Sequence, residues 1–147
     1  MAGGRPGQAL TPVSSQDRVR SLFASDRYAA SLGVELMAAD PVTVALALGD
    51  VHRNFAGSTH GGVVFSLADC ALSLAANAAG VRAVAIDTHL VLSAASEPGD
   101  RLTAVAHEVT RGARIASYRV MVTRADGRVC GIFTGTVFID ASGAGDD

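Results

Sequence analysis

The residues that decide the fold are 60–80, HGGVVFSLADCALSLAANAAG. After His60 this stretch contains one acidic residue, Asp69, and no basic residue. On a helix of about 3.6 residues per turn, apolar side chains cover most of the circumference and leave a polar stripe about 80° wide. The stripe consists of Gly62, Ser66, Asp69, Ser73 and Asn77. A helix with so little polar surface must be covered on nearly every side, and its many alanines let a curved sheet approach closely. The sequence therefore predicts a buried helix wrapped by a sheet.

Four extended runs after this helix supply most of that sheet. They cover residues 82–96, 102–110, 114–124 and 128–139. The Asp126-Gly127 pair between the last two runs is a strong hairpin signal. In the last run every second residue from Val129 to Ile139 shares one face, which we expect to pack inward.

The chain before residue 60 predicts one more helix and one or two more strands. Ser14 or Ser15 can cap a helix that runs to about Ser31, and the pattern turns extended at Gly33. The predicted fold class is α+β, with a long Ala-rich helix wrapped by a curved antiparallel sheet of five or six strands and an extra N-terminal helix. We expect a single domain over residues 1–147, with flexible tails at 1–13 and 141–147.

The composition excludes several classes of function. The 147 residues are 49% hydrophobic and 18% charged, with a net charge of −2. We therefore expect a homo-oligomer, and neither a nucleic-acid nor a membrane partner. The basic residues are all Arg, so no lysine is available for a Schiff base.

Cellular location and metal content can also be predicted. The first residues lack the apolar core of an export signal, and Cys70 and Cys130 lie in apolar runs, as in a reduced protein. The cytoplasm is the expected location. The four histidines have no metal-ligand spacing with one another or with a cysteine, so no metal site is expected.

Asp69 is the main candidate for chemistry. Because it lies among apolar neighbours, we expect it to be half-buried, and desolvation would raise its pKa and make it a better base or nucleophile at neutral pH. The residues Ser58 to Gly62 offer hydroxyls that can cap the helix, and Gly61 and Gly62 let a ligand approach unpaired backbone N–H groups. Each donor of this kind, aimed at a developing oxyanion, is worth on the order of 3–4 kcal/mol of barrier.

The spacing of these groups predicts an assembly. Asp69 lies about 12 Å along the helix from Gly61, so one reacting carbonyl cannot lie close to both groups within a single chain. Two antiparallel copies of the helix, related by a twofold axis, would bring Gly61 of one chain opposite Asp69 of the other. We therefore expect a dimer with two composite sites.

The run from residue 54 to residue 77 carries a family resemblance. Its matched positions are Asn54, His60, Gly61, Gly62, Phe65, Ser66, Leu67, Ala68, Asp69, Ala75, Ala76 and Asn77. This pattern resembles the hotdog-fold acyl-CoA thioesterases of the phenylacetic-acid-degradation type, and the likeness covers about residues 20–140. It implies hydrolysis of (hydroxy)phenylacetyl-CoA or of a similar aryl or medium-chain acyl-CoA.

The resemblance also implies roles for individual residues. Asp69 takes the place of the catalytic acid, either activating water or attacking the thioester, and Gly61 takes the place of the amide that polarises the carbonyl. Asn54 matches the residue that helps to place the thioester, and Ser73 matches a hydroxyl that can hold the water. His60 matches the motif histidine, whose role is either structural or catalytic.

Coenzyme A is by this resemblance part of the substrate, and no separate cofactor is implied. The residues expected to contact it are Gly62, Arg111, Gly112 and Arg114, and Ala113 stands where relatives often have Lys. We expect the homo-oligomer to be a homotetramer, built as a dimer of dimers, although the sequence does not decide between a dimer and a tetramer.

Two other functions remain open at this point. Asp87 and His89 point the same way on a strand and could form the acid–base dyad of an enoyl-CoA hydratase or dehydratase. A non-catalytic module that binds acyl-CoA without cleaving it is the second alternative.

Overall fold

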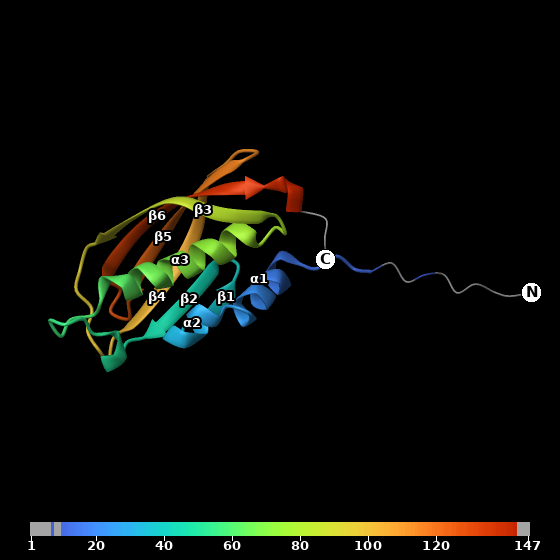
Figure 1. The fold of residues 1–147 in the computed structure, drawn as a ribbon. Helices are drawn as coiled ribbons and strands as arrows, with labels where there is room; N and C mark the ends of the chain where they lie inside the picture. The colour runs from blue at the N-terminus through green and yellow to red at the C-terminus, as the bar shows by residue number, and fades with distance from the viewer. Residues whose placement is uncertain (1–6, 8–9, 144–147) are drawn as a thin grey trace, which may run out of the picture.

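The computed structural model describes Gly7 and residues 10–143, which form one curved sheet around a central helix (Figure 1). Its elements are α1 (Ser15–Ala24), α2 (Arg27–Leu32), β1 (Glu35–Ala39), β2 (Val42–Ala47), η1 (Asp50–His52), α3 (Gly61–Asn77), β3 (Arg82–Leu92), β4 (Arg101–Arg111), β5 (Ile115–Arg124), β6 (Val129–Asp140) and η2 (Ala141–Gly143). The six strands form one antiparallel sheet in the order β1-β2-β4-β5-β6-β3. The predicted α+β architecture is confirmed.

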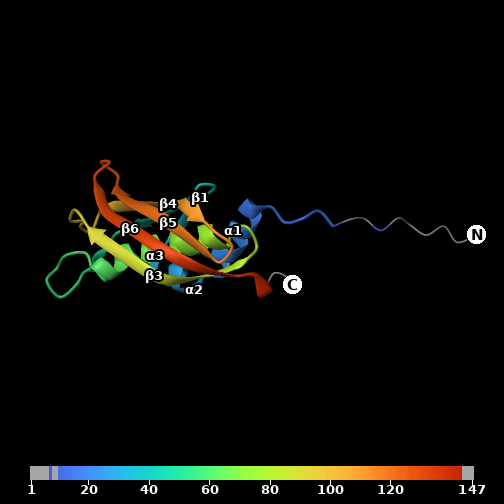
Figure 2. The same cartoon turned by 90° about the horizontal axis from the view of Figure 1, so that it is seen from above.

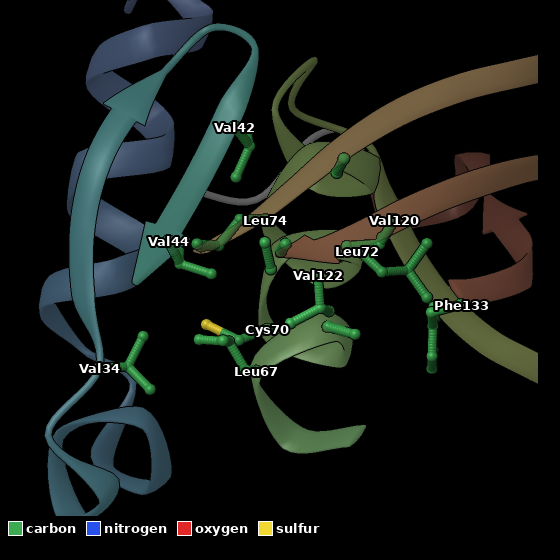
Figure 3. Close-up of a cluster of buried hydrophobic side chains, with 14 of the residues drawn as sticks. Val34, Val42, Val44, Leu67, Cys70, Leu72, Leu74, Val120, Val122 and Phe133 are labelled. Atoms are coloured by element: carbon green, nitrogen blue, oxygen red, sulfur yellow. The ribbon is translucent and has the colours of Figure 1, made fainter. Parts of the chain in front are cut away.

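Helix α3 packs along one face of the sheet, and the views in Figures 1 and 2 both show the strands curving around it. Leu67, Ala68, Ala71 and Leu72 of α3 are completely buried. Figure 3 shows Val42 and Val44 of β2 on one side of the helix, and Val120 of β5 with Phe133 of β6 on the other. Every residue of the predicted polar stripe is at least partly exposed, so that stripe is the one side of α3 that the sheet leaves open.

Two glycines of β6 allow the helix to lie this close to the sheet. A Cβ atom on Gly135 would lie 2.6 Å from Leu72 Cδ2, and one on Gly131 would lie 3.0 Å from Val64 Cγ1. Both glycines belong to the face of β6 that was predicted to pack inward, and Phe133 between them is fully buried. Because these two glycines have no side chain, the sheet can approach α3 closely. The small side chains of the helix contribute to the same close packing.

The N-terminal helix differs from the prediction. Instead of one helix to about Ser31, the chain forms α1 and α2, separated at Ser25 and Asp26. Ser14 caps α1 as predicted, because its hydroxyl accepts from the Asp17 N–H at 3.0 Å. The Asp26 carboxylate caps α2 in the same way, accepting from the Ala29 N–H at 2.9 Å. A second cap in mid-run therefore starts a second helix.

Smaller differences concern the ends of elements. The first predicted run after α3 reaches 96, but strand β3 ends at Leu92. Residues 141–143 of the predicted C-terminal tail form the short helix η2, and 10–13 have no regular structure. The remaining tail residues, 1–6, 8–9 and 144–147, lie outside the described residues. None of the helices within the described part of the chain is long and apolar enough to cross a membrane.

Candidate active site

Asp69 lies midway along α3 and lines a cavity of about 340 Å³ between α3 and α2. Its side chain is half-buried, as predicted, and burial raises the pKa of its carboxyl above the ordinary value. The apolar part of the lining comes from Ala29, Leu32, Val34 and Phe65. A carboxylate with a raised pKa beside an apolar cavity is suited to act as a base or as a nucleophile.

Asp26 is a second acidic residue of this cavity, and the sequence analysis did not identify it. Its negative charge is the second cause, after burial, of the raised pKa of Asp69. The hydrogen bond from the Ala29 N–H fixes the Asp26 carboxylate at the start of α2. The sequence signal that could have identified Asp26 is the Ser-Asp pair at 25–26, which is typical of a helix start. This pair lay inside the stretch that we predicted as one continuous helix.

Cys70 also lines the cavity, but it is not a second nucleophile. Burial, together with the charges of Asp26 and Asp69, raises the pKa of its thiol to about 12. The thiolate is the reactive form of cysteine, so Cys70 is inert at neutral pH. Asp69 therefore remains the candidate reactive group of this cavity, rather than Cys70.

The start of α3 is capped by His60 and not by a hydroxyl. The Gly62 N–H donates to His60 Nδ1 at 2.9 Å. The predicted Ser58 or Thr59 cap is wrong, and Thr59 Oγ1 is buried without a hydrogen-bond partner in the described structure. His60 thus has a structural contact, and that contact takes up the N–H of Gly62.

The N–H of Gly61 remains available. No acceptor for it exists among residues 10–143, so it can donate to a ligand as the positive end of the α3 dipole. A Cβ atom on Gly61 would lie 2.9 Å from Leu92 Cδ1. The absence of a side chain at Gly61 therefore makes room for Leu92 beside the start of α3.

Asn54 holds the loop that leads into α3. Its Oδ1 accepts from the Ala56 N–H at 2.9 Å and from the Ser58 N–H at 3.2 Å. This turn fixes the backbone shortly before Gly61. The amide nitrogen of the side chain has no acceptor within the described residues and remains free to donate to a substrate.

The candidate residues fall into two groups within one chain. Ser73 lines the cavity of Asp69, one helical turn further on. His60 and Gly62 line a different cavity of about 480 Å³ at the start of α3, and Asp69 does not reach it. This separation agrees with the helix spacing, which keeps the glycine turn and the acid of one chain apart.

The two arginines expected to contact coenzyme A have different surroundings. Arg111 donates to Glu108 Oε2 at 2.9 Å and to the Tyr118 hydroxyl at 2.8 Å, and Tyr118 in turn donates to Glu108 Oε2 at 2.7 Å. Arg111 is thus held inside the protein's own network. Arg114 is exposed and has no ion pair within residues 10–143. The Gly112 N–H is also occupied, by the Ile115 carbonyl at 2.7 Å.

The alternative dyad lies elsewhere. Asp87 and His89 are exposed on β3, next to Thr136 and Thr134 of β6. They line a cavity of about 190 Å³ that shares no residue with the cavity of Asp69. No hydrogen bond joins the two side chains in the described structure, so the geometry gives the hydratase alternative no support.

Comparison with known proteins identifies the family. The thioesterase superfamily profile matches residues 56–131. A Deinococcus radiodurans protein, provisionally named an esterase, is 40% identical over 113 residues, which cover 75% of this chain and 77% of that protein. The chain therefore belongs to the thioesterase superfamily.

Solved structures define the class more closely. The structure of the Escherichia coli PaaI protein from the phenylacetic acid degradation operon superposes with a TM-score of 0.83 at 26% identity, over 86% of this chain and 94% of that one. A Streptococcus pneumoniae hypothetical thioesterase, solved with coenzyme A, has a TM-score of 0.70 at 25% identity, covering 73% and 85% of the two chains. The fold is the hotdog fold, and the protein is a thioester hydrolase.

Proposed function

We propose that this thioester hydrolase cleaves acyl-CoA, with (hydroxy)phenylacetyl-CoA or a similar aryl or medium-chain thioester as its substrate. The observation that carries the proposal is Asp69, a half-buried carboxylate with a raised pKa beside an apolar cavity. The relatives support the choice of coenzyme A. Escherichia coli PaaI, 28% identical over 78% of this chain and 84% of its own length, is named an acyl-coenzyme A thioesterase.

The cavity of Asp69 suits a compact acyl group. Its volume of about 340 Å³ is at the lower end of the range for small-molecule sites. Phe65 can place its ring against an aromatic acyl group, and Leu32 and Val34 can contact either an aromatic or an aliphatic one. The apolar lining therefore favours burial of the acyl portion here, with the thioester carbon near Asp69.

The reaction uses two groups that lie on opposite subunits. The thioester oxygen accepts from the N–H of Gly61 of the partner subunit, which stabilises the negative charge that develops on it. The Asp69 carboxylate either takes a proton from a water that attacks the carbonyl carbon, or attacks that carbon itself to form an anhydride that water then opens. The carbon–sulfur bond breaks, and coenzyme A leaves as a thiolate that takes up a proton. The Ser73 hydroxyl is placed to hold the water.

The exposed edge of β3 supports the dimer that this mechanism needs. β3 has 11 residues and is the last strand of the sheet, and no strand among residues 10–143 pairs with its outer side. Val84, Ile86, Val91 and Leu92 of this strand are 45–59% exposed. A long apolar edge strand of this kind is a template for pairing with another strand. We place a second copy of the chain there, and a further pairing of two dimers would give a homotetramer.

Thiol release is the direct test of this function. Purified protein is given a panel of aromatic and aliphatic acyl-CoA esters and a thiol-reactive dye. Hydrolysis frees one thiol per turnover, whereas a hydratase would change an enoyl ester without freeing a thiol and a binding module would do neither. Absence of thiol release across the panel would contradict the proposal.

A further inference from the structure

Tyr28 and Ser66 form part of the wall between two cavities. Tyr28, Phe65 and Ser66 line both the cavity of about 340 Å³ that contains Asp69 and the neighbouring cavity of about 480 Å³ at the start of α3. Phe65 is fixed from behind, because its ring packs edge-on against the buried Phe133 with centroids 5.4 Å apart. Tyr28 is 62% exposed and is the least buried member of this wall.

A chain of hydrogen bonds holds Tyr28 in this position. Its hydroxyl lies 2.9 Å from Ser66 Oγ, and Ser66 Oγ lies 2.8 Å from the Gly62 carbonyl oxygen. A carbonyl only accepts, so Ser66 gives its one hydrogen to Gly62 and Tyr28 is the donor to Ser66. The phenol is therefore latched across the gap between α2 and α3.

The rest of α2 is firmly anchored, so the phenol can move while the helix stays in place. The Asp26 carboxylate caps the start of α2, and Gly33 ends it in the left-handed conformation, with φ 83°. Ala29 of α2 is itself almost completely buried. One exposed hydrogen bond between two hydroxyls contributes only about 0.5–1.5 kcal/mol, so the latch is weak compared with these anchors.

We propose that Tyr28 is a specificity-determining residue that sets the upper size limit of the acyl group. This inference rests on the proposed function, which places the acyl group in the cavity of Asp69. With the phenol latched to Ser66, the acyl group is confined to that cavity. Without the phenol, the two cavities merge and a longer acyl chain extends toward the start of α3.

The test measures substrate preference and not activity alone. The kcat/KM of dodecanoyl-CoA is divided by that of hexanoyl-CoA for the wild type and for Tyr28→Ala, a substitution that also favours the helix. We expect this ratio to rise about tenfold or more in Tyr28→Ala, since a few buried methylenes are worth a factor of this size. In Tyr28→Phe and Ser66→Ala, which remove only the latch, we expect a smaller rise of about two- to fivefold.

Arg27→Ala is the matched control, because Arg27 is exposed on the same helix and lines neither cavity. Its ratio should equal that of the wild type. A Tyr28→Ala ratio within twofold of the wild type would overturn the proposal, as would equal loss of activity on both substrates. If Tyr28→Ala does not fold, Tyr28→Leu replaces it with the same expected direction. Wild-type turnover of either ester tests the proposed function separately, so failure of the size limit and failure of the function can be distinguished.

Discussion

Asp26 and Asp69 line the same cavity, although Asp26 caps α2 and Asp69 lies midway along α3. Burial is the larger cause of the raised pKa of Asp69, and the charge of Asp26 adds to it. The cap of a short helix thus also adjusts the reactive carboxylate. This relationship gives the site a pH dependence that can be measured.

Asp26→Asn should shift the acidic limb of the pH profile to lower pH. The amide oxygen still caps α2, but the negative charge that opposes ionisation of Asp69 is gone. Asp69 acts in its ionised form, so a lower pKa keeps the enzyme active at lower pH. The measurement is kcat/KM from pH 4 to 8, with Asp17→Asn on α1 as the control. An acidic limb that stays in place or moves upward would contradict the coupling.

Asp69→Asn should reduce turnover by at least about 100-fold without destabilising the protein. The folded pKa of Asp69 is raised above its unfolded value. The folded state therefore holds the proton more tightly, and stability is lost as pH rises through the window between the two values. At pH 7 the ionised, partly desolvated carboxylate of Asp69 destabilises the folded state. Asn carries no charge at this position, so we expect the Tm of Asp69→Asn to rise by about 1–3 °C.

The difference in Tm between Asp69→Asn and the wild type should vanish near pH 3, where the carboxyl is protonated in both states. Thermal melts at the two pH values check this. A drop in Tm of several degrees at pH 7 would show that Asp69 has a structural role. It would also contradict the claim that burial of its ionised carboxylate destabilises the folded state.

Arg114→Ala should raise KM for acyl-CoA several-fold and leave kcat nearly unchanged, because the free guanidinium is available to a phosphate. Arg111→Ala should instead lower Tm, because it leaves Glu108 and the buried Tyr118 with one partner fewer. For Arg114→Ala the control substrate is an N-acetylcysteamine thioester, which has no phosphates. Equal KM changes on both substrates would exclude a phosphate contact by Arg114.

Much of the fold could be predicted because two periodicities are strong. The near-continuous apolar surface of α3 and the alternation along β6 each admit one packing solution. The break between α1 and α2 was missed because an amphipathic pattern continues across it, while the deciding contact is a single Asp26 cap. The hydroxyl cap predicted for α3 was wrong because an imidazole can accept the same N–H, which residue type alone does not indicate.

The site could be predicted only in part, for a similar reason. Asp69 was found because it is the one charged residue of an otherwise nearly apolar helix. Asp26 and Tyr28 are distant from it in sequence and join the cavity only when α2 packs on α3. The different surroundings of Arg111 and Arg114 likewise depend on the pairing of strands: Glu108 lies on the same strand as Arg111, and the neighbouring strand β5 brings Tyr118 to both.

Gly61→Val needs a control of its own, because a side chain there would also meet Leu92. We expect Gly61→Val to lose activity both alone and together with Leu92→Ala, since the valine still covers the amide. Recovery in the double variant would mean that the clash with Leu92, and not access to the N–H, caused the loss.

Complementation between two inactive variants tests the composite site most directly. Asp69→Asn and Gly61→Val chains with different tags are expressed together, and dimers carrying both tags are purified. In a mixed dimer one site combines both substitutions, while the other has an intact Asp69 and an intact Gly61 from different chains. We predict recovery of about half the wild-type kcat per dimer. Activity no higher than that of the two parent variants would contradict a site shared between subunits.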